Sequence, residues 1–314
     1  MLTIRTPVRR IDALAYSPDG AELAAGGVSP GGTEHGIVVL TPDGRPTWGR
    51  ALADCPVSTV GYTAAGGHLL AVARHVTPSS FRGGLFVLDR YDLNARPDPL
   101  DDWMAFAVAA DRLLGTVRVG GVHGRDERFV CRRLSSDGVV GPLWDVAGEA
   151  GTDAVGVALL PDGRAVTIGH DREDSGRVIG LTLAVRSADT GRVLATATPP
   201  GQTHGPLTAS PDGERLVLNA GGSLFVWRVA DLTAPPRKVT FGRKHCTGVA
   251  FLADGHLLAA GNDGTIRRID PDTGATAASY SFTAGKVRSL AVAPDGPTAA
   301  VGTDRGTVIV FDLD

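Results

Sequence analysis

Residues 14–19 read Leu14-Ala-Tyr-Ser-Pro-Asp19, and this phrase decides the fold because variants of it return along the whole chain. Each copy runs from an apolar residue through a small one to a turn. The seven copies occupy Leu14–Asp19, Val60–Ala65, Phe106–Asp111, Val157–Asp162, Leu207–Asp212, Val249–Asp254 and Leu290–Asp295. Their final residues lie 46, 46, 51, 50, 42 and 41 positions apart. A period of this length indicates a ring or stack of similar units.

Each unit reads as four short strands. A tight turn such as Asp-Gly joins the phrase to a second apolar run, which predicts a β-hairpin. A third apolar run and a more polar fourth run follow in most units, separated by turn sequences such as Pro42-Asp-Gly44. Four strands in about 45 residues match one propeller blade. The sequence therefore predicts an all-β fold, a seven-bladed β-propeller of four-stranded antiparallel blades.

The second position of the phrase holds a small residue in every copy, as expected where neighbouring sheets crowd together near a common axis. These residues are Ala15, Gly61, Ala107, Ala158, Thr208, Ala250 and Ala291. We interpret the column as a packing requirement.

The two ends of the chain are expected to share one blade. The last unit stops after its third strand, at Phe311–Asp314, while a strand-like segment at Leu2–Thr6 precedes the first phrase. We therefore expect residues 1–314 to form a single propeller domain in which residues 1–6 supply the outer strand of the C-terminal blade. Such closure leaves no open sheet edge between the first and last blades.

Across its full length the sequence resembles the WD40-repeat family. The resemblance rests on Ser17-Pro-Asp-Gly20, Ser210-Pro-Asp-Gly213, Ala293-Pro-Asp-Gly296, Asn262-Asp-Gly-Thr265 and the strand endings Val226-Trp-Arg228, Ile269-Asp270 and Phe311-Asp312. No unit keeps the family's Trp-Asp ending intact, and the family's structural Asp is matched only at Asp263 and, less closely, at Asp304. The repeats are thus a divergent, bacterial-type version of the pattern.

The charge, the cysteines and the apolar stretches of the sequence limit the kinds of partner and location that we expect. The formal charge is −3 and no Lys or Arg run occurs, so we expect no nucleic acid to bind directly. The three cysteines stand alone, which predicts reduced, buried thiols without a disulfide or zinc site. No stretch is long and apolar enough for a signal peptide or membrane span, which predicts a cytoplasmic protein without membrane contact. Because all strand pairing is expected to be internal, we also predict a monomer.

Loop length points to one face of the ring. The predicted connections between second and third strands are short in the last three units and long in the first four, at Val28–Gly36, Arg74–Gly84, Val119–Arg128 and His170–Gly176. Four adjacent long loops would form a lopsided rim, and loops on a rigid scaffold often bind partners. The candidate binding residues there are His35, His75, Phe81, Arg82, His123, Arg125, Asp126, His170, Arg172 and Glu173. The alternative is that these loops are tolerated insertions, which cost little stability.

Other readings of the same residues remain open. Phe81 is either an interface anchor or packed beneath its own loop. The histidines, joined by His204 and His245, lack the spacing of a metal site, so we expect surface roles and neither metal nor cofactor. The Asp171–Asp174 cluster reads as a solvated loop rather than a catalytic pair.

No hydrolase or phosphate-binding motif occurs. The sequence predicts a protein- or peptide-binding scaffold; the alternatives are a propeller hydrolase or lactonase acting at the channel mouth, and a ligand-sensing ring.

Overall fold

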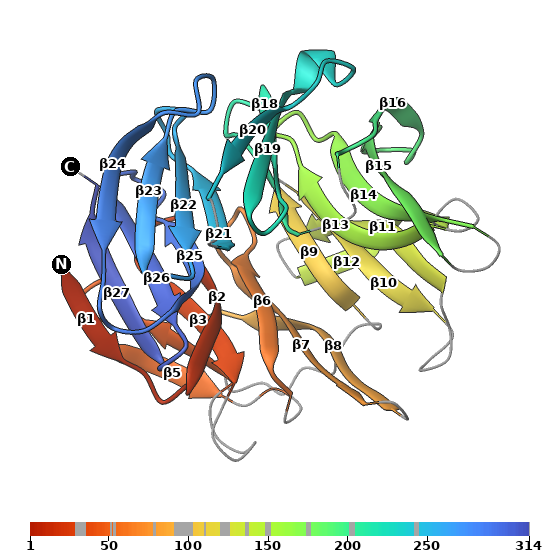
Figure 1. Ribbon diagram of the computed structural model, residues 1–314. Coiled ribbons are helices and arrows are strands. Elements are labelled where there is room, and N and C mark those ends of the chain that lie inside the picture. The colour runs from red at the N-terminus through yellow and green to blue at the C-terminus, as the bar shows by residue number, and fades with distance from the viewer. Residues whose placement is uncertain are drawn as a thin grey trace.

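The computed structural model contains seven antiparallel sheets arranged around a ring, seen obliquely in Figure 1. It describes residues 1–28, 36–50, 52, 55–77, 80–90, 103–109, 111–119, 126–135, 138–147, 152–173, 177–200, 205–241 and 245–313. Within these residues six sheets have four strands and one has three. The prediction of a seven-bladed β-propeller is confirmed.

The blades are numbered in chain order, and each runs from an inner to an outer strand. Blade 1 holds β2 (Arg10–Tyr16), β3 (Leu23–Val28), β4 (Ile37–Leu40) and β5 (Pro46–Arg50); blade 2 holds β6 (Val57–Tyr62), β7 (His68–Thr77) and β8 (Ser80–Asp89). Blade 3 holds β9 (Trp103–Ala109), β10 (Arg112–Val119), β11 (Asp126–Ser135) and β12 (Gly138–Ala147); blade 4 holds β13 (Thr152–Leu159), β14 (Ala165–Arg172), β15 (Val178–Arg186) and β16 (Val193–Ala197).

The remaining blades follow the same order. Blade 5 holds β17 (Leu207–Ala209), β18 (Arg215–Asn219), β19 (Ser223–Arg228) and β20 (Arg237–Thr240), with a 3-10 turn, η3 (Val229–Asp231), after β19. Blade 6 holds β21 (Cys246–Phe251), β22 (Leu257–Gly261), β23 (Thr265–Ile269) and β24 (Thr276–Ser281); blade 7 holds β25 (Val287–Val292), β26 (Thr298–Thr303), β27 (Thr307–Asp312) and β1 (Leu2–Arg5).

The repeated phrase forms the turn between the first two strands of a blade. In blade 1 the Ser17 hydroxyl donates to the Asp19 carboxylate at 2.6 Å and accepts a hydrogen bond from the Glu22 N–H at 2.9 Å. Gly20 closes the turn at φ +69°, a conformation that side chains with a Cβ rarely adopt. The second Ser-Pro-Asp-Gly turn, which begins at Ser210, is built in the same way. The phrase thus satisfies its own polar groups and reverses the chain in a few residues.

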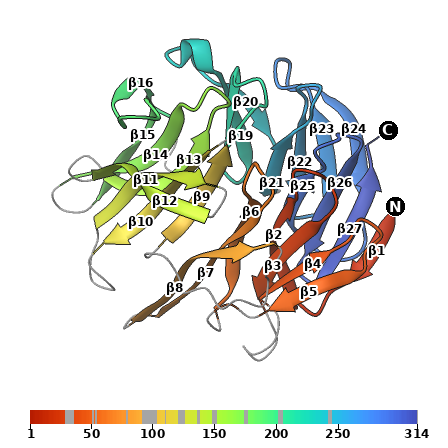
Figure 2. The same cartoon turned by 180° about the vertical axis from the view of Figure 1, so that it is seen from behind.

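The ring is closed by the first strand of the chain. β1 pairs antiparallel with β27 in the register Leu2↔Val310 to Arg5↔Thr307, and Figure 2 shows the two strands side by side. The inner strands contact one another in ring order, and β25 of blade 7 returns onto β2 of blade 1. The prediction that the first residues supply the outer strand of the last blade is therefore consistent with this sheet.

The hydrophobic core is divided among the junctions between blades. Seven clusters of buried side chains occur among the described residues, and each draws its members from two neighbouring blades. The small residue of each phrase belongs to this packing, because a Cβ on Gly61 would lie 3.0 Å from Cε2 of Phe106 in the next blade. Stability therefore comes from each blade covering its neighbour.

All three cysteines are buried and unbridged, as predicted. Burial raises the pKa of Cys131 to about 11 and that of Cys246 to about 12. Both thiols are therefore protonated at neutral pH, and the thiolate is the reactive form of cysteine. These residues serve packing.

Candidate functional site

The middle hairpins of blades 2, 3 and 4 extend past the length that blade 6 uses. In blade 6 the pairing of β22 with β23 ends at Ala260↔Ile266. In blade 2 the pairing of β7 with β8 passes the matching position, Val72↔Leu85, and continues to Thr77↔Ser80. Figures 1 and 2 show this hairpin protruding from the ring.

Blades 3 and 4 carry shorter extensions of the same kind. β10 and β11 continue to Val119↔Asp126, and β14 and β15 continue to Arg172↔Val178. We call the three extensions together the ridge, comprising residues 74–77 with 80–83, 118–119 with 126–127, and 170–172 with 178–181. The ridge lies on the face of the ring that carries the turns between second and third strands.

The prediction of a loop at Arg74–Gly84 is wrong for residues 74–77 and 80–84, and the predicted loops at Val119–Arg128 and His170–Gly176 contain strand residues at 119, 126–128 and 170–172. The backbone groups of residues 74–77 pair with those of residues 80–83, and residues 170–172 pair with residues 178–181. Residues 74–77, 80–83 and 170–172 are mostly polar, so these stretches lack the apolar alternation by which a half-buried strand is recognised. The hydrogen bonds between paired strands need only backbone N–H and C=O groups, so the pairing continues although the side chains are polar.

The ten predicted binding residues fall into three groups. His35, His123 and Arg125 lie outside the described residues, so their placement stays a prediction. The second group lies at strand positions of the ridge, where His75 is paired with Arg82 and Phe81 with Val76, Asp126 begins β11 and Arg172 ends β14. Glu173 follows β14 and is exposed, and its backbone N–H donates to the Arg177 carbonyl at 3.0 Å.

His170 forms the third group and differs from its predicted place. It lies within β14, and only 8% of the residue is exposed. The prediction of an exposed loop histidine there is wrong, because the ladder continues through this position. The adjacent Asp171 also has a structural partner, since its carboxylate accepts a hydrogen bond from the Thr182 hydroxyl at 2.9 Å.

Ion pairs on the opposite face join neighbouring blades near the turns that follow first and third strands. Arg90 reaches Asp19 at 2.9 Å between blades 2 and 1. Arg112 reaches Asp189 at 2.9 Å between blades 3 and 4, and Arg215 reaches Asp272 at 2.8 Å between blades 5 and 6. These pairs link adjacent blades at their turn ends.

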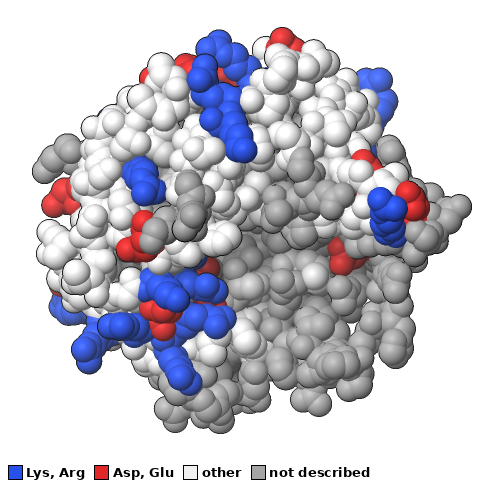
Figure 3. Space-filling model, in the orientation of Figure 1, with Lys and Arg blue, Asp and Glu red and all other residues white. Residues whose placement is uncertain are grey.

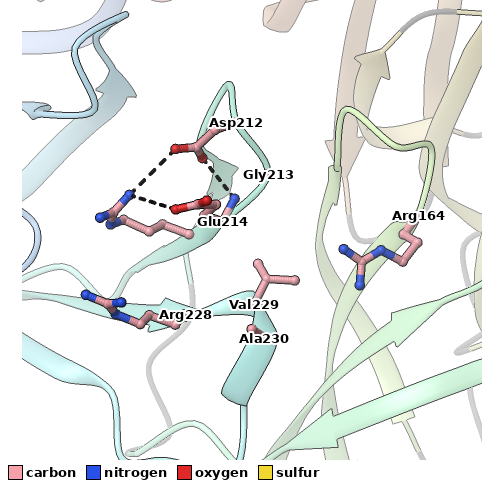
Figure 4. Close-up of a pocket in the computed structure, with 8 residues that line it drawn as sticks. Arg164, Asp212, Gly213, Glu214, Arg228, Val229 and Ala230 are labelled. Atoms are coloured by element: carbon pink, nitrogen blue, oxygen red, sulfur yellow. Dashed lines mark hydrogen bonds and ion pairs between the residues drawn. The ribbon is translucent and has the colours of Figure 1, made fainter.

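A cavity of about 530 Å³ opens on this face between blades 4 and 5. Figure 4 shows Arg164 approaching from blade 4, with Asp212, Glu214 and Arg228 around the opening on blade 5. Arg164 pairs with Asp162 of its own turn at 2.7 Å. Arg215, at the same cavity, lies 3.6 Å from Asp212 and 3.8 Å from Glu214.

Two carboxylates that pair with Arg215, those of Asp212 and Asp272, have lowered pKa values. The Ser210 hydroxyl and the Glu214 backbone N–H both donate to Asp212 and keep its pKa below the usual range. The guanidinium of Arg215 similarly lowers the pKa of Asp272. A group that stays ionised throughout the neutral range is poorly suited to general acid–base catalysis there. Its fixed charges are suited to recognition and to holding blades together.

These inter-blade pairs were not predicted from the sequence. The three aspartates lie in turns between strands, whereas their arginine partners lie far along the chain. Arg90 is 71 residues from Asp19, and Arg215 is 57 residues from Asp272. One signal in the sequence was an Arg or Glu at or directly before the start of the second strand, at Glu22, Arg112 and Arg215.

Two common features of functional proteins are absent from the described part of the chain. No group of three or more His, Cys, Asp or Glu side chains there could hold a metal ion. No helix among the same residues has the length and apolar character that crossing a membrane requires.

Comparisons with known proteins agree with the architecture. The family model described as "WD domain, G-beta repeat" matches residues 237–270 and 277–312. Each match begins at or within the outer strand of one blade and ends with the third strand of the next, so the sequence repeat is offset from the blade by one strand.

Two similar proteins illustrate the relationship. The U3 small nucleolar RNA-associated protein 4 homolog of Mus musculus is 34% identical over 105 residues, which cover 30% of this chain and 15% of that protein. The chain thus matches a small part of that relative. The crystal structure of the Myceliophteria thermophila Cps50 (Swd1) β-propeller domain superposes with a TM-score of 0.73 at 13% identity, and the match covers 100% of this chain and 99% of that one. At this level of sequence identity, the likeness to the Cps50 (Swd1) domain shows a shared fold.

Proposed function

Because the chain is a WD40-repeat β-propeller, we propose that it acts as a scaffold that binds a protein or peptide partner through the face that carries the ridge. WD40 propellers generally serve as platforms for protein interactions, and the choice of face is our proposal. The observation that carries it is the extended pairing of β7 with β8, from Arg74↔Gly83 to Thr77↔Ser80.

Paired hairpins support binding better than loose insertions would. A strand pair keeps its backbone ordered before a partner arrives, so less conformational entropy is lost on binding. The ridge occupies three neighbouring blades, while the matching hairpins of blades 5 and 6 are short. A partner resting on this face would therefore meet a high side and a low side, which fixes its orientation.

The test is an affinity capture from a lysate of the cells that make this protein, analysed by quantitative mass spectrometry. The ridge variant replaces residues 74–83 with Asn-Gly, so that the Ala73↔Gly84 pair is joined by a two-residue hairpin turn. The control variant is Arg228→Ala, which alters the cavity on the opposite face. Circular dichroism and thermal melting establish that both variants are folded.

We expect a partner that the intact protein and Arg228→Ala capture and that the ridge variant loses. Equal capture by all three proteins would overturn the role of this hairpin. Loss with Arg228→Ala alone would move the binding surface to the opposite face. The predicted cytoplasmic location and monomeric state are compatible with a scaffold and stay predictions.

A further inference from the structure

Five cations gather where blade 7 meets blade 1. They are Arg9, Arg10, Lys286, Arg288 and Arg305, which we call the basic cluster. They lie at the starts of the inner strands β2 and β25 and in the turn between β26 and β27. Figure 3 shows blue atoms gathered around a small red area in the lower left of the molecule, over the part where β2 and β25–β27 lie in Figure 1.

Contacts between these segments make the cluster continuous. A Cβ on Gly306 would lie 2.1 Å from the Val8 carbonyl oxygen, so the turn that holds Arg305 lies against the residue before Arg9. A Cβ on Gly285 would lie 3.2 Å from Cγ of Arg305, which places the Arg305 side chain beside the residue before Lys286.

Asp12 holds two of the five cations in place. Nε of Arg10 lies 2.8 Å from the Asp12 carboxylate, and Nε of Arg288 approaches the same carboxylate at 3.4 Å. A shared carboxylate keeps both guanidinium groups on the same side of the junction. Both arginine side chains stay 43% exposed, so their remaining N–H groups are accessible to a ligand.

The other three cations have no such restraint. Arg9, Lys286 and Arg305 are exposed, and none of them has a side-chain hydrogen bond or ion pair to another described residue. Asp304 lies beside them, but one of its carboxylate oxygens accepts a hydrogen bond from the Lys286 backbone N–H at 2.9 Å. Five cations thus surround two carboxylates on a chain whose formal charge is −3. This excess of positive charge is local and accessible.

The cluster shares a face with the ridge. The turn between β26 and β27 and the turn between β7 and β8 both connect a second strand to a third, so they emerge on the same side of the ring. The ridge rises on blades 2 to 4, and the cations lie on blades 7 and 1, where the β26–β27 turn is short. A partner held against the ridge would extend over the cations.

An acidic protein segment fits this surface better than a nucleic acid does. A duplex presents one phosphate charge about every 1.7 Å along its axis, which calls for an extended basic track rather than a compact cluster containing Asp12 and Asp304. Guanidinium groups bind carboxylates in a planar, two-pronged geometry. Separate carboxylates on a flexible chain can reach the free cations while avoiding the two acidic residues.

We propose that the basic cluster binds an acidic segment, rich in Asp and Glu, of the partner protein. This inference rests on the proposed scaffold function and names the chemical character of the partner. The ridge would set the orientation, and the cluster would select for negative charge and speed the encounter.

The test uses purified intact protein and a fluorescein-labelled peptide in which Asp and Ser alternate, with binding followed by fluorescence anisotropy at physiological salt. The cluster variant carries Arg9→Glu, Lys286→Glu and Arg305→Glu, the three cations whose side chains have no partner among the described residues. The control variant carries Arg45→Glu, Arg192→Glu and Arg228→Glu, which are exposed at other places and change the net charge by the same amount. Thermal melting establishes that both variants are folded.

We expect the cluster variant to weaken peptide binding by at least about tenfold and the control by less than about twofold, because a Debye length of about 8 Å screens distant charges. A peptide with Asn in place of Asp should not bind. Equal weakening by both variants, or no binding of the acidic peptide, would overturn the proposal. Tighter cluster-dependent binding of single-stranded DNA would instead assign the cluster to nucleic acid. The capture experiment on the ridge does not depend on this peptide, so either proposal can fail alone.

Discussion

Arg90 donates a hydrogen bond to Asp19 at 2.9 Å, across the junction between blades 2 and 1 and across 71 residues of sequence. The same guanidinium lies 3.0 Å from Glu22 and 5.9 Å from the centre of the Tyr62 ring. Only 11% of the Arg90 side chain is exposed. One side chain therefore connects the turn of one blade to the strands of the next.

Arg90→Ala should lower the free energy of unfolding by about 1–2 kcal/mol, a value between those of exposed and buried ion pairs because Asp19 is half exposed. Urea denaturation measures the change. Arg45→Ala serves as the control, since Arg45 and its partner Asp43 are both exposed, and it should leave the urea midpoint unchanged. Equal effects of the two substitutions would show that the junction pair adds nothing.

The contribution of this pair should depend on pH in a defined direction. The hydrogen bond from Arg90, followed by that from Ser17, holds the pKa of Asp19 below its ordinary value of 3.8. A carboxyl with a lower pKa in the folded state stabilises the fold fully above its ordinary pKa, and this stabilisation is lost as the pH falls toward the folded-state value. Urea unfolding between about pH 7 and about pH 3 should show wild type and Arg90→Ala converging below about pH 4. A constant difference over that range would contradict this origin.

Closure of the ring gives a prediction that separates two residues of one strand. Ile4 is 9% exposed and packs into the cluster between blades 7 and 1, whereas Leu2 of the same strand is 37% exposed. Ile4→Ala should lower the free energy of unfolding by about 2–3 kcal/mol and Leu2→Ala by less than about 1 kcal/mol. Thermal and urea unfolding report both changes. Similar small losses would mean that β1 contributes little to closure.

Gly115 should tolerate no side chain. A Cβ there would lie 2.0 Å from Cζ3 of Trp103, which is fully buried against the neighbouring strand. Gly115→Ala should therefore cost about 1–3 kcal/mol through displacement of the indole. Gly141→Ala is the matched control, because that strand glycine has no neighbouring atom within 4 Å of an added Cβ. Near-UV circular dichroism of the tryptophans, combined with urea unfolding, distinguishes the two.

Much of the architecture could be predicted because the residues that form the turns and inner strands lie close together in each repeat. The Ser-Pro-Asp-Gly turns are local, and so is the small residue of each phrase, as the contact between Gly61 and Phe106 confirms. The pairing of the first strand with the last blade could also be inferred from one unclaimed strand and one incomplete unit. These features can be predicted without knowing how residues from distant parts of the sequence are arranged in space.

The parts that could not be predicted depend on distant residues or on strand length. His170 is buried because β14 continues through a polar segment that resembles a loop. The basic cluster joins Arg10 to Arg288 through Asp12, and Arg288 lies 276 residues beyond Asp12. With no Lys or Arg run in the sequence, such a gathering of charge appears only after the ring has closed.

The pairing of β1 with β27 also sets an order of events during synthesis. The Thr6 hydroxyl donates to the carbonyl of Gly306, 300 residues away, and β1, which directly precedes Thr6, is therefore translated long before its partner β27. Local hairpins can form as they emerge, but the pairing of β1 with β27 waits until β27 has been translated. Until then β1 has an unpaired edge that can join another nascent chain. A truncated translation product would carry that exposed edge permanently, and we expect chaperones to retain it.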